Sequence, residues 1–455
     1  MKRILTVLTT LCCVLALFAD PIGREQATSL ARKYVRGNIA PRLVNAPRRA
    51  AASATATPPL YVFSRGENQG FVIVAGDDCA PSIIGVVDKG EYDESKFPPA
   101  LVYLLDEWSR YITNAQATGT NTPRGLRKSL GTYDIAPLIQ TFWGQGDPYN
   151  RRCPYLDSGV VHSVTGCVAT QGAMLAYYWR NECYDCVQED TPLYNFGEMG
   201  EDPDMQIKAG TPYRWDLMHE RYGYIGGVES QFTAENGDAV AVLMATIGMT
   251  SKLYYGRETG GSLGDLNKAL QSQLGLAGDF IYRSGYKDDD WYGMVIANLQ
   301  NHQPIGYAGG GHAYILDGYS KFDDTFHFNF GWEGFQDGYF TLLPDDPVAA
   351  GGYKSNQHML CNVLPLHPAL DARVLDEEFV YGQENTFRVL VTSRSAARYN
   401  GLYVLLSAEA ADAASATTTS LYDKSTAIAP GENVELTFRF TPDRYKPYHY
   451  AIYDK

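Results

Sequence analysis

The chain lacks an excess of basic residues, and this lack excludes one large class of function. Its 455 residues include 38 Lys and Arg against 52 Asp and Glu, a formal net charge of −14 at pH 7. General nucleic-acid binders present a basic face, so no nucleic-acid partner is expected. A hydrophobic content of 45% and a charged content of 20% exclude disorder throughout the chain. The length predicts two to four domains.

Long apolar runs are scarce as well. One run, at residues 4–18, follows Lys2 and Arg3 and ends before Ala19, a pattern that predicts a secretory signal peptide over residues 1–19. It is too short for a transmembrane anchor, and no later segment is apolar enough to span a bilayer. We therefore expect a secreted or cell-surface protein with no stable membrane insertion after the signal is removed.

Cysteine is sparse for a chain of this length. Beyond the signal the sequence holds Cys79, Cys153, Cys167, Cys183, Cys186 and Cys361, which is too few for a disulfide scaffold. Cys183 and Cys186 form one C-x-x-C motif, but no second pair completes a four-ligand zinc site. A local disulfide or two free thiols are expected there, with zinc or redox chemistry as the alternative. We expect no metal and no cofactor.

Hydrophobic periodicity predicts a small α+β unit over residues 20–128. Its expected helices and strands lie at residues 24–36, 60–63, 71–75, 83–87 and 99–112. Residues 113–132 are polar and contain Gly and Pro. Exposed segments of this kind are preferred sites of proteolytic cleavage, although a plain interdomain linker has the same composition.

A second unit is predicted over residues 129–366. Its helix-like stretch after Cys167 precedes strand-like runs at residues 313–316, 325–330 and 339–343, and this order favours an α+β fold over βαβ winding.

The final stretch changes character. Alternating apolar and polar residues predict an all-β, Ig-like sandwich module over residues 367–455. The last strand-like run stops at the end of the chain, which leaves open whether the module is complete.

Cys167 is the candidate nucleophile. It follows the Thr165-Gly166 turn and opens a helix-like apolar stretch. A thiol reacts as its thiolate, and the positive end of a helix dipole together with a histidine lowers the pKa of a cysteine. His312, which follows three glycines and precedes a strand-like run, is the candidate base. Each residue alone is more typical of a structural role, but the two together predict nucleophilic catalysis.

Two further residues suit the same chemistry. Asn329 can hold the second ring nitrogen of the histidine without adding a charge. Gln145, in a glycine-flanked loop, can donate its side-chain amide to the oxyanion of acyl transfer. Two other histidines compete for a role. His162 is expected to be a supporting or surface residue, and His327 is the alternative base.

Several segments resemble those of the streptopain family of papain-like cysteine peptidases. They are residues 144–150, 165–170, 310–313 and 329–332, and residues 70–77 are similar to the family's inhibitory propeptide. The resemblance covers residues 20–365. It implies a two-lobed papain-like fold, endopeptidase activity through a Cys-His thiolate–imidazolium pair and an acyl-enzyme, and synthesis as a zymogen inhibited by its own propeptide. Carried over by motif, Cys167 is the nucleophile, His312 the base, Gln145 the oxyanion donor and Asn329 the orienter.

One position departs from the family pattern. Phe330 stands where the pattern has Trp, so shielding of the His–Asn pair falls to Phe330, to Trp332 or to both. The all-β module lies outside the minimal enzyme, although secreted relatives from oral Bacteroidetes look similar in carrying such extensions.

Two alternative functions remain open. Another Cys-His acyl-transfer enzyme, such as a cell-wall amidase or a transglutaminase, shares the chemistry and differs in substrate. A non-enzymatic surface-binding protein would use the β-module on an inactive scaffold, which the intact Cys167, His312 and Asn329 set argues against. The expected partners are protein and peptide substrates and the chain's own propeptide.

Overall fold

The computed structural model describes most of the chain. The described residues are 20–35, 40–44, 57–118, 131–156, 160–193, 205–225, 228–344, 356–366, 370–376, 380, 382–393, 402–408, 418–423, 428, 432–441 and 448–454. The predicted signal at residues 1–19 and most of the predicted cleavage stretch lie outside them. None of the helices in the described part is both long and apolar enough to cross a membrane.

The chain divides into two compact units. The first comprises residues 1–94, 104–127 and 346–354, and the second comprises residues 95–103, 128–345 and 355–455. The short segment at residues 95–103 therefore belongs to the second unit, although it lies within the predicted N-terminal domain.

Apolar runs in the first unit form an antiparallel meander. Its strands are β1 (Arg42–Leu43), β2 (Leu60–Ser64), β3 (Phe71–Ala75) and β4 (Ile83–Val87), which pair in sequence order. Helix α1 (Arg24–Ala31), continued by a 3₁₀ turn at Arg32–Tyr34, packs against β2 and β3 with Ala27 and Ala31 buried. The strands predicted at residues 71–75 and 83–87 are confirmed.

Helix α2 (Pro99–Thr118) follows a 3₁₀ turn at Glu94–Lys96. Its predicted apolar face is confirmed, because Leu101, Leu105, Trp108 and Ile112 are all buried. The helix continues beyond the predicted end at residue 112. At its C-terminal end the Thr118 hydroxyl donates to the Asn114 carbonyl at 2.9 Å, a bond within the last turn that sequence periodicity does not reveal.

Six strands of the second unit pair antiparallel in the order β11-β10-β9-β8-β12-β7. The strands are β7 (Leu276–Tyr282), β8 (Ile305–Gly309), β9 (His312–Ser320), β10 (Thr325–Asn329), β11 (Gly338–Phe340) and β12 (His358–Pro365). Strand β9 is longer than predicted because its residues pair with β8 and β10 along nearly its whole length. Strand β11 ends at Phe340, before the predicted limit of 343.

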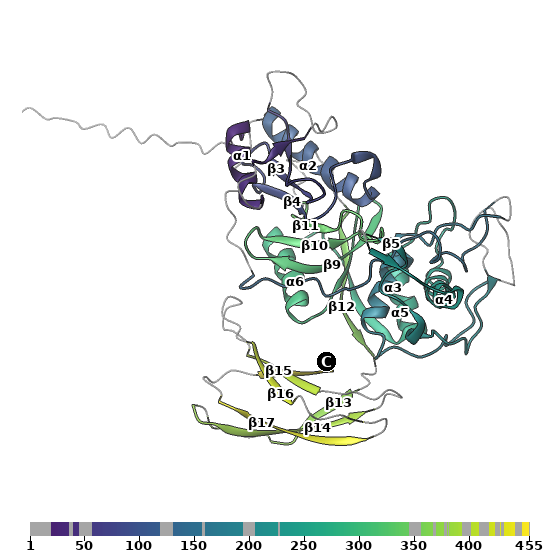
Figure 1. Ribbon diagram of the computed structural model, residues 1–455. Coiled ribbons are helices and arrows are strands. Elements are labelled where there is room, and N and C mark those ends of the chain that lie inside the picture. The colour runs from purple at the N-terminus through teal and green to yellow at the C-terminus, as the bar shows by residue number, and fades with distance from the viewer. Residues whose placement is uncertain are drawn as a thin grey trace, which may run out of the picture. The chain divides into compact units, whose positions relative to one another are not determined.

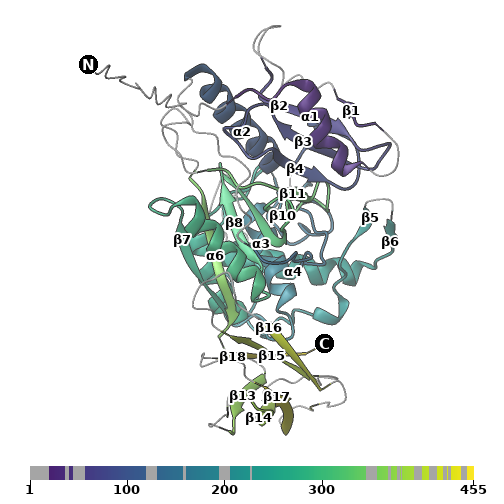
Figure 2. The ribbon, with the colours of Figure 1, turned by 90° about the vertical axis from the view of Figure 1, so that its left-hand side faces the viewer.

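Four helices accompany this sheet. They are α3 (Cys167–Tyr178), α4 (Ala234–Thr250), α5 (Leu263–Leu274) and α6 (Asp288–Gln300). In Figure 1, α3 and α5 lie on one side of the sheet and α6 lies on the other, and Figure 2 shows α6 next to β8, which it contacts together with β9 and β12. Strands β8 and β9 are buried nearly throughout because both of their faces are covered.

Local signals fix the ends of the helices behind the cleft. Thr233 and Asn236 form a capping box at the start of α4. Ser262 caps α5, which ends at Gly275 in the left-handed conformation. A 3₁₀ turn at Trp215–Leu217 and a short hairpin of β5 (Gly223–Ile225) and β6 (Val228–Ser230) precede α4. Together with the sheet, these helices confirm the α+β class.

The described residues of the C-terminal module form strands, as predicted. One antiparallel sheet comprises β13 (Leu370–Val374), β14 (Asn385–Ser393) and β17 (Asn433–Phe440). The other comprises β15 (Leu402–Ala408), β16 (Thr418–Asp423) and β18 (Tyr448–Asp454). The predicted alternation is confirmed in β14 and β17, where Phe387, Val389, Val391, Leu436 and Phe438 are buried.

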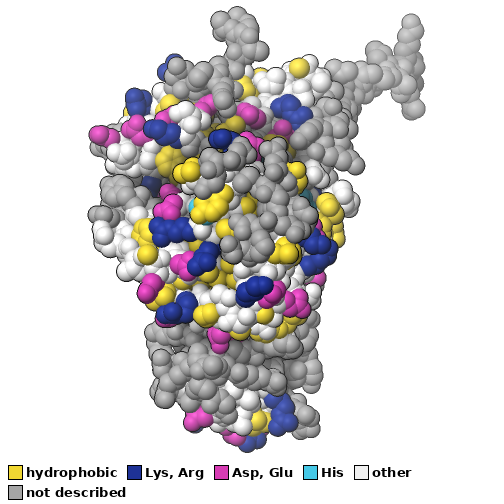
Figure 3. Space-filling model, turned by 90° about the vertical axis from the view of Figure 1, so that its right-hand side faces the viewer, with side chains coloured by type: hydrophobic (Ala, Val, Ile, Leu, Met, Phe, Trp, Pro, Cys, Tyr) yellow, Lys and Arg dark blue, Asp and Glu magenta, His cyan; other side chains and the backbone are white. Residues whose placement is uncertain are grey.

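Basic and acidic side chains lie close together on the face shown in Figure 3. Among the described residues of the second unit, Arg152 pairs with Asp238 at 2.6 Å and Lys208 with Asp190 at 3.0 Å. Exposed pairs of this kind contribute little to stability. They do neutralise basic charge locally.

Candidate active site

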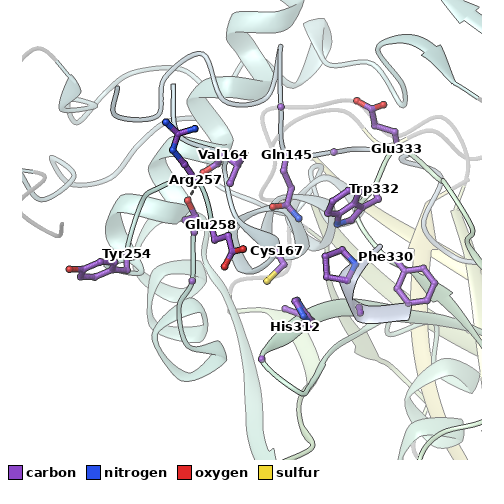
Figure 4. A pocket seen from close by; sticks show the side chains of 18 residues that line it. Gln145, Val164, Cys167, Tyr254, Arg257, Glu258, His312, Phe330, Trp332 and Glu333 are labelled. Atoms are coloured by element: carbon purple, nitrogen blue, oxygen red, sulfur yellow. Dashed lines mark hydrogen bonds between the residues drawn. The ribbon is translucent and has the colours of Figure 1, made fainter. Parts of the chain in front are cut away.

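A cleft of about 990 Å³ in the second unit contains three of the four predicted site residues. Gln145 reaches it from the loop before the nucleophile, Cys167 from the first turn of α3 and His312 from the first residue of β9 (Figure 4). These residues are far apart in sequence, and the packing of α3 against β9 brings the thiol and the imidazole to one place.

The N-terminus of α3 is held by a close approach between two segments. Gly166 precedes Cys167 with φ of 83°, a conformation that favours glycine. A Cβ on Gly166 would lie 2.8 Å from the carbonyl oxygen of Thr259, so a larger residue would push the two segments apart. The Thr170 hydroxyl donates to the Gly166 carbonyl at 3.0 Å and fixes the first turn.

Cys167 is half-buried at the positive end of α3. Burial raises the pKa of its thiol, while the backbone N–H groups of Ala313, Val168 and Cys167 itself lower it. Burial is the larger effect, so the net shift of the thiol pKa is upward. The contact with the Ala313 N–H places the sulfur beside the start of β9.

His312 is positioned by a two-residue hairpin. Gly310 and Gly311 join β8 to β9 with φ of 62° and 82°, and Gly309 pairs with His312 across the turn. Two positive φ angles are typical of the tight turns that match strand twist. The imidazole is half-buried; burial lowers its pKa and the Glu258 carboxylate raises it.

Gln145 lies in a loop that is tied to the segment before the nucleophile. The Thr165 N–H donates to the Gln145 carbonyl at 3.1 Å. Farther along the loop, the Asn150 side chain donates to the Ser163 carbonyl at 3.1 Å. The backbone of Gln145 therefore keeps a fixed place relative to Cys167, and its side chain is half-buried.

Asn329 does not line the cleft directly. Its Nδ2 donates to the Thr141 carbonyl at 3.0 Å, and its Oδ1 accepts the Gly331 N–H at 3.1 Å. These bonds hold the turn that brings Phe330 and Trp332 to the cleft wall. Both polar atoms of the Asn329 side chain thus form hydrogen bonds to backbone groups. The contact predicted between Asn329 and His312 stays a prediction.

The two other histidines have partners away from the cleft. His162 Nδ1 lies 2.6 Å from the Cys153 carbonyl, and the ring stacks on Tyr155. His327 Nδ1 lies 2.6 Å from Asp317 Oδ1. Neither residue lines the cleft, so the structure gives no support to His327 as the base.

The structure also shows the environment of the two thiols of the C-x-x-C motif. Cys183 is buried and Cys186 is partly exposed, and both are free. Among the described residues, no cluster of His, Cys, Asp and Glu has the arrangement of a metal site.

Models of two known protein families match the chain, each over its own segment. Residues 143–340 match the model of the Peptidase C10 family, and residues 19–112 match that of the Spi protease inhibitor. The first segment is thus similar to the peptidase C10 family. The resemblance to streptopain-type peptidases is therefore confirmed.

Individual relatives agree with this assignment. The chain is 28% identical over 405 residues to the thiol protease/hemagglutinin PrtT of Porphyromonas gingivalis, covering 80% of this chain and 44% of that protein. It is 26% identical over 340 residues to streptopain of Streptococcus pyogenes, covering 67% and 81%. The chain thus spans less than half the length of PrtT.

A solved structure is similar over a comparable range. A fragment of prointerpain A from Prevotella intermedia, carrying a Cys-to-Ala substitution, matches with a TM-score of 0.56 and 25% identity, covering 70% of this chain and 97% of that one. A Spi-like segment before a C10 segment fits a peptidase made as a zymogen.

Sequence patterns missed one wall of the C10 cleft. Tyr254, Arg257, Glu258, Thr259 and Gly260 line it from the connection between α4 and α5. This stretch has neither helical nor strand periodicity. Its glycines are the only feature of the sequence that indicates a loop here. Pro99 and Ala100, the first residues of α2, also line the cleft.

We expect Gly166→Ala to reduce kcat/KM for peptide hydrolysis on the order of 10–100-fold, because a displacement of about 1 Å at a reacting group has effects of that size. The Cβ would meet the Thr259 carbonyl in a conformation that favours glycine. Gly293→Ala in α6, where the Cβ meets nothing within 4 Å, is the matched control. Wild-type kcat/KM and Tm in Gly166→Ala would contradict the proposed constraint.

A second prediction concerns Asp337, whose side chain holds the backbone of the cleft residue Phe330. Asp337 accepts the Phe330 N–H at 2.9 Å, but its other oxygen is out of contact with solvent and has no hydrogen-bond partner among the described residues. Burial raises the pKa of Asp337 to about 7, against the smaller opposing effect of His327. The unfolded chain ionises this group at about pH 3.9.

Between these two values the unfolded state loses the proton first, so the free energy of unfolding falls as pH rises, by up to about 1.4 kcal/mol per pH unit. Asp337→Asn keeps an acceptor for Phe330 and removes this dependence. Urea unfolding at pH 4, 5.5 and 8 in a Cys167→Ala background measures it. A difference between Asp337→Asn and its parent that does not change with pH would exclude the buried neutral carboxyl.

Proposed function

We propose that the chain is a secreted cysteine endopeptidase, made as an inactive precursor and acting on proteins and peptides. The observation that carries this proposal is one cleft that holds a thiol at a helix N-terminus, an imidazole at the start of a strand and a side-chain amide from a third segment. Proteins whose names include thiol protease and streptopain share the C10 segment.

The proposed reaction assigns one role to each residue. His312 takes the proton of Cys167, and the thiolate attacks the carbonyl carbon of the scissile peptide bond. The tetrahedral oxyanion accepts hydrogen bonds from the Cys167 N–H and from the side-chain amide of Gln145. His312 then gives its proton to the leaving amine, and an acyl-enzyme remains. Water, deprotonated by His312, releases the acid and restores the thiol.

Residues at the start of α2 support latency of the precursor. Pro99 and Ala100 line the cleft, and the ring of Tyr103 packs on Gly310, where a Cβ would lie 2.3 Å from it. This segment belongs to the same compact unit as Cys167 and His312. In the proposed precursor it narrows access to the thiol and contacts the hairpin that carries the base.

The proposed domain limits are a signal at residues 1–19, a propeptide at 20–128, a catalytic domain at 129–366 and a β-module at 367–455. The two family matches lie almost entirely within the second and third of these ranges. The polar stretch at residues 113–132 is the proposed activation site, because its composition exposes the backbone to proteolysis. The N-terminal charged and apolar pattern supports export.

Substitution of the cleft residues tests the chemistry. Cys167→Ala and His312→Ala are each expected to abolish measurable casein hydrolysis, since the two act as a unit. Gln145→Ala should lower kcat by roughly 10²–10³, the effect of losing one oxyanion donor. Asn329→Ala should have a milder effect. Near-ultraviolet circular dichroism checks that each variant is folded. Undiminished hydrolysis by pure Cys167→Ala protein would falsify the assignment of the nucleophile, and inhibition by E-64 distinguishes a peptidase from other acyl-transfer enzymes.

Latency gives a separate prediction. Cys167→Ala precursor should persist uncut until active enzyme is added, and the new N-terminus should then map within residues 113–132. Tyr103→Ala should speed alkylation of Cys167 in the intact precursor, because it removes the ring on Gly310. Val102→Ala, one position away on α2, is the matched control. A full-length precursor that cleaves casein at the mature rate without processing would show that residues 20–128 have another role.

A further inference from the structure

The connection between α4 and α5 contains a closed loop, residues 254–260, which we call the cleft loop. Its ends pair with each other: the Tyr254 N–H donates to the Gly260 carbonyl at 2.9 Å, and the Gly260 N–H donates to the Tyr254 carbonyl at 3.2 Å. The loop therefore has a defined conformation although it contains neither helix nor strand.

Thr259 fastens the cleft loop to the segment that leads into the nucleophile. Its buried hydroxyl donates to the Val164 carbonyl at 2.8 Å and accepts the Gly256 N–H at 3.1 Å. The Val164 N–H donates in turn to the Gly256 carbonyl at 3.3 Å. Together with the close approach of Gly166 to Thr259, these bonds fix the cleft loop relative to Cys167.

The neighbouring charged side chains point in different directions. In Figure 4 the Glu258 carboxylate points into the cleft, toward Cys167 and His312, whereas Arg257 and Glu333 point away from them. The titratable groups that line the cleft with His312 are Cys167 from α3, Tyr254, Arg257 and Glu258 from the cleft loop and Glu333 from the turn after β10. Tyr103 of α2 packs on the adjacent Gly310 in the precursor.

A charged imidazole in this position needs a negative partner. Burial of His312 disfavours its protonated form, and the Glu258 carboxylate acts in the opposite direction. Asn329, which is neutral, is engaged with Thr141 and Gly331. Glu258 is the carboxylate that the cleft loop aims at the pair.

We propose that Glu258 is a positioning residue that stabilises the imidazolium form of His312 in the thiolate–imidazolium pair, and so extends activity toward higher pH. This inference rests on the proposed cysteine-peptidase chemistry. Glu258 acts through His312 by its charge and takes no part in bond making or breaking.

The test uses the mature enzyme and a peptide substrate without ionisable side chains. Glu258→Gln should move the basic limb of the kcat/KM profile to lower pH by about 0.2–0.7 unit, the size expected for an exposed carboxylate that acts on a nearby positive charge. The shift should shrink in 1 M salt, because an exposed interaction is screened. Glu258→Asp, which keeps the charge, should recover part of it.

Two control variants separate this effect from general loss of negative charge. Asp265→Asn removes one carboxylate from the first turn of α5, where Asp265 pairs with Lys268, and should leave the limb in place. Glu333→Gln removes the second carboxylate of the cleft, which points away from His312, and should also leave the limb in place.

Alkylation of Cys167 by neutral iodoacetamide across the same pH range gives a readout that does not need peptide hydrolysis. If the change in alkylation rate at high pH occurs at the same pH in Glu258→Gln and in the wild type, the inference is wrong. A second set of peptides, which carry Lys or Arg, tests the other possibility. If Glu258→Gln lowers kcat/KM only for those peptides, the carboxylate contacts substrate and the inference is wrong. A shifted alkylation profile in a protein that cleaves no peptide would sustain Glu258 and refute the proposed peptidase function.

Discussion

The position of Cys167, the proposed nucleophile, depends on the burial of helix α3. Ten of its twelve residues, Val168 to Tyr177, are buried, so the helix cannot shift without exposing apolar surface. Gln171 reinforces this position by donating to the carbonyls of Tyr307 and Tyr314 in β8 and β9. Cys167 is the first residue of this fixed helix, and the strand that Gln171 holds begins with His312. One helix thus sets the positions of both partners of the proposed reacting pair.

The sequence was informative where a local rule decides the structure. The apolar runs of β3 and β4 and the stripe of α2 follow from hydrophobic burial alone, and their predictions hold. Cys167 and His312 were recognisable because a glycine turn precedes each one and a regular element begins at it. Local rules failed where the conformation depends on a contact between residues that are distant in sequence. The partners of Asn329 are one example, since Thr141 lies far away along the chain. The cleft loop is another, because its shape comes from bonds to Val164.

The start of α2 lies in the same compact unit as the proposed catalytic residues, although it precedes the predicted cleavage stretch. Cutting the chain at residues 113–132 would therefore not remove this segment by itself. Pro99, Ala100 and Tyr103 would remain until their packing on the cleft and on Gly310 is lost. Activation on this view has two steps, a covalent cut and a dissociation. The second step depends on how well residues 95–103 pack.

Burial also acts on the chemistry itself. It raises the pKa of the Cys167 thiol and lowers that of the His312 imidazole, so both shifts favour the neutral pair over the ion pair. Pro99 and Ala100, at the start of α2, line the same cleft. Their departure would hydrate both groups and weaken both shifts, while the N–H groups around the sulfur and the Glu258 carboxylate would remain in place. Removal of the propeptide would then do more than open a path for substrate, because it would also move the proton equilibrium toward the reactive thiolate–imidazolium form.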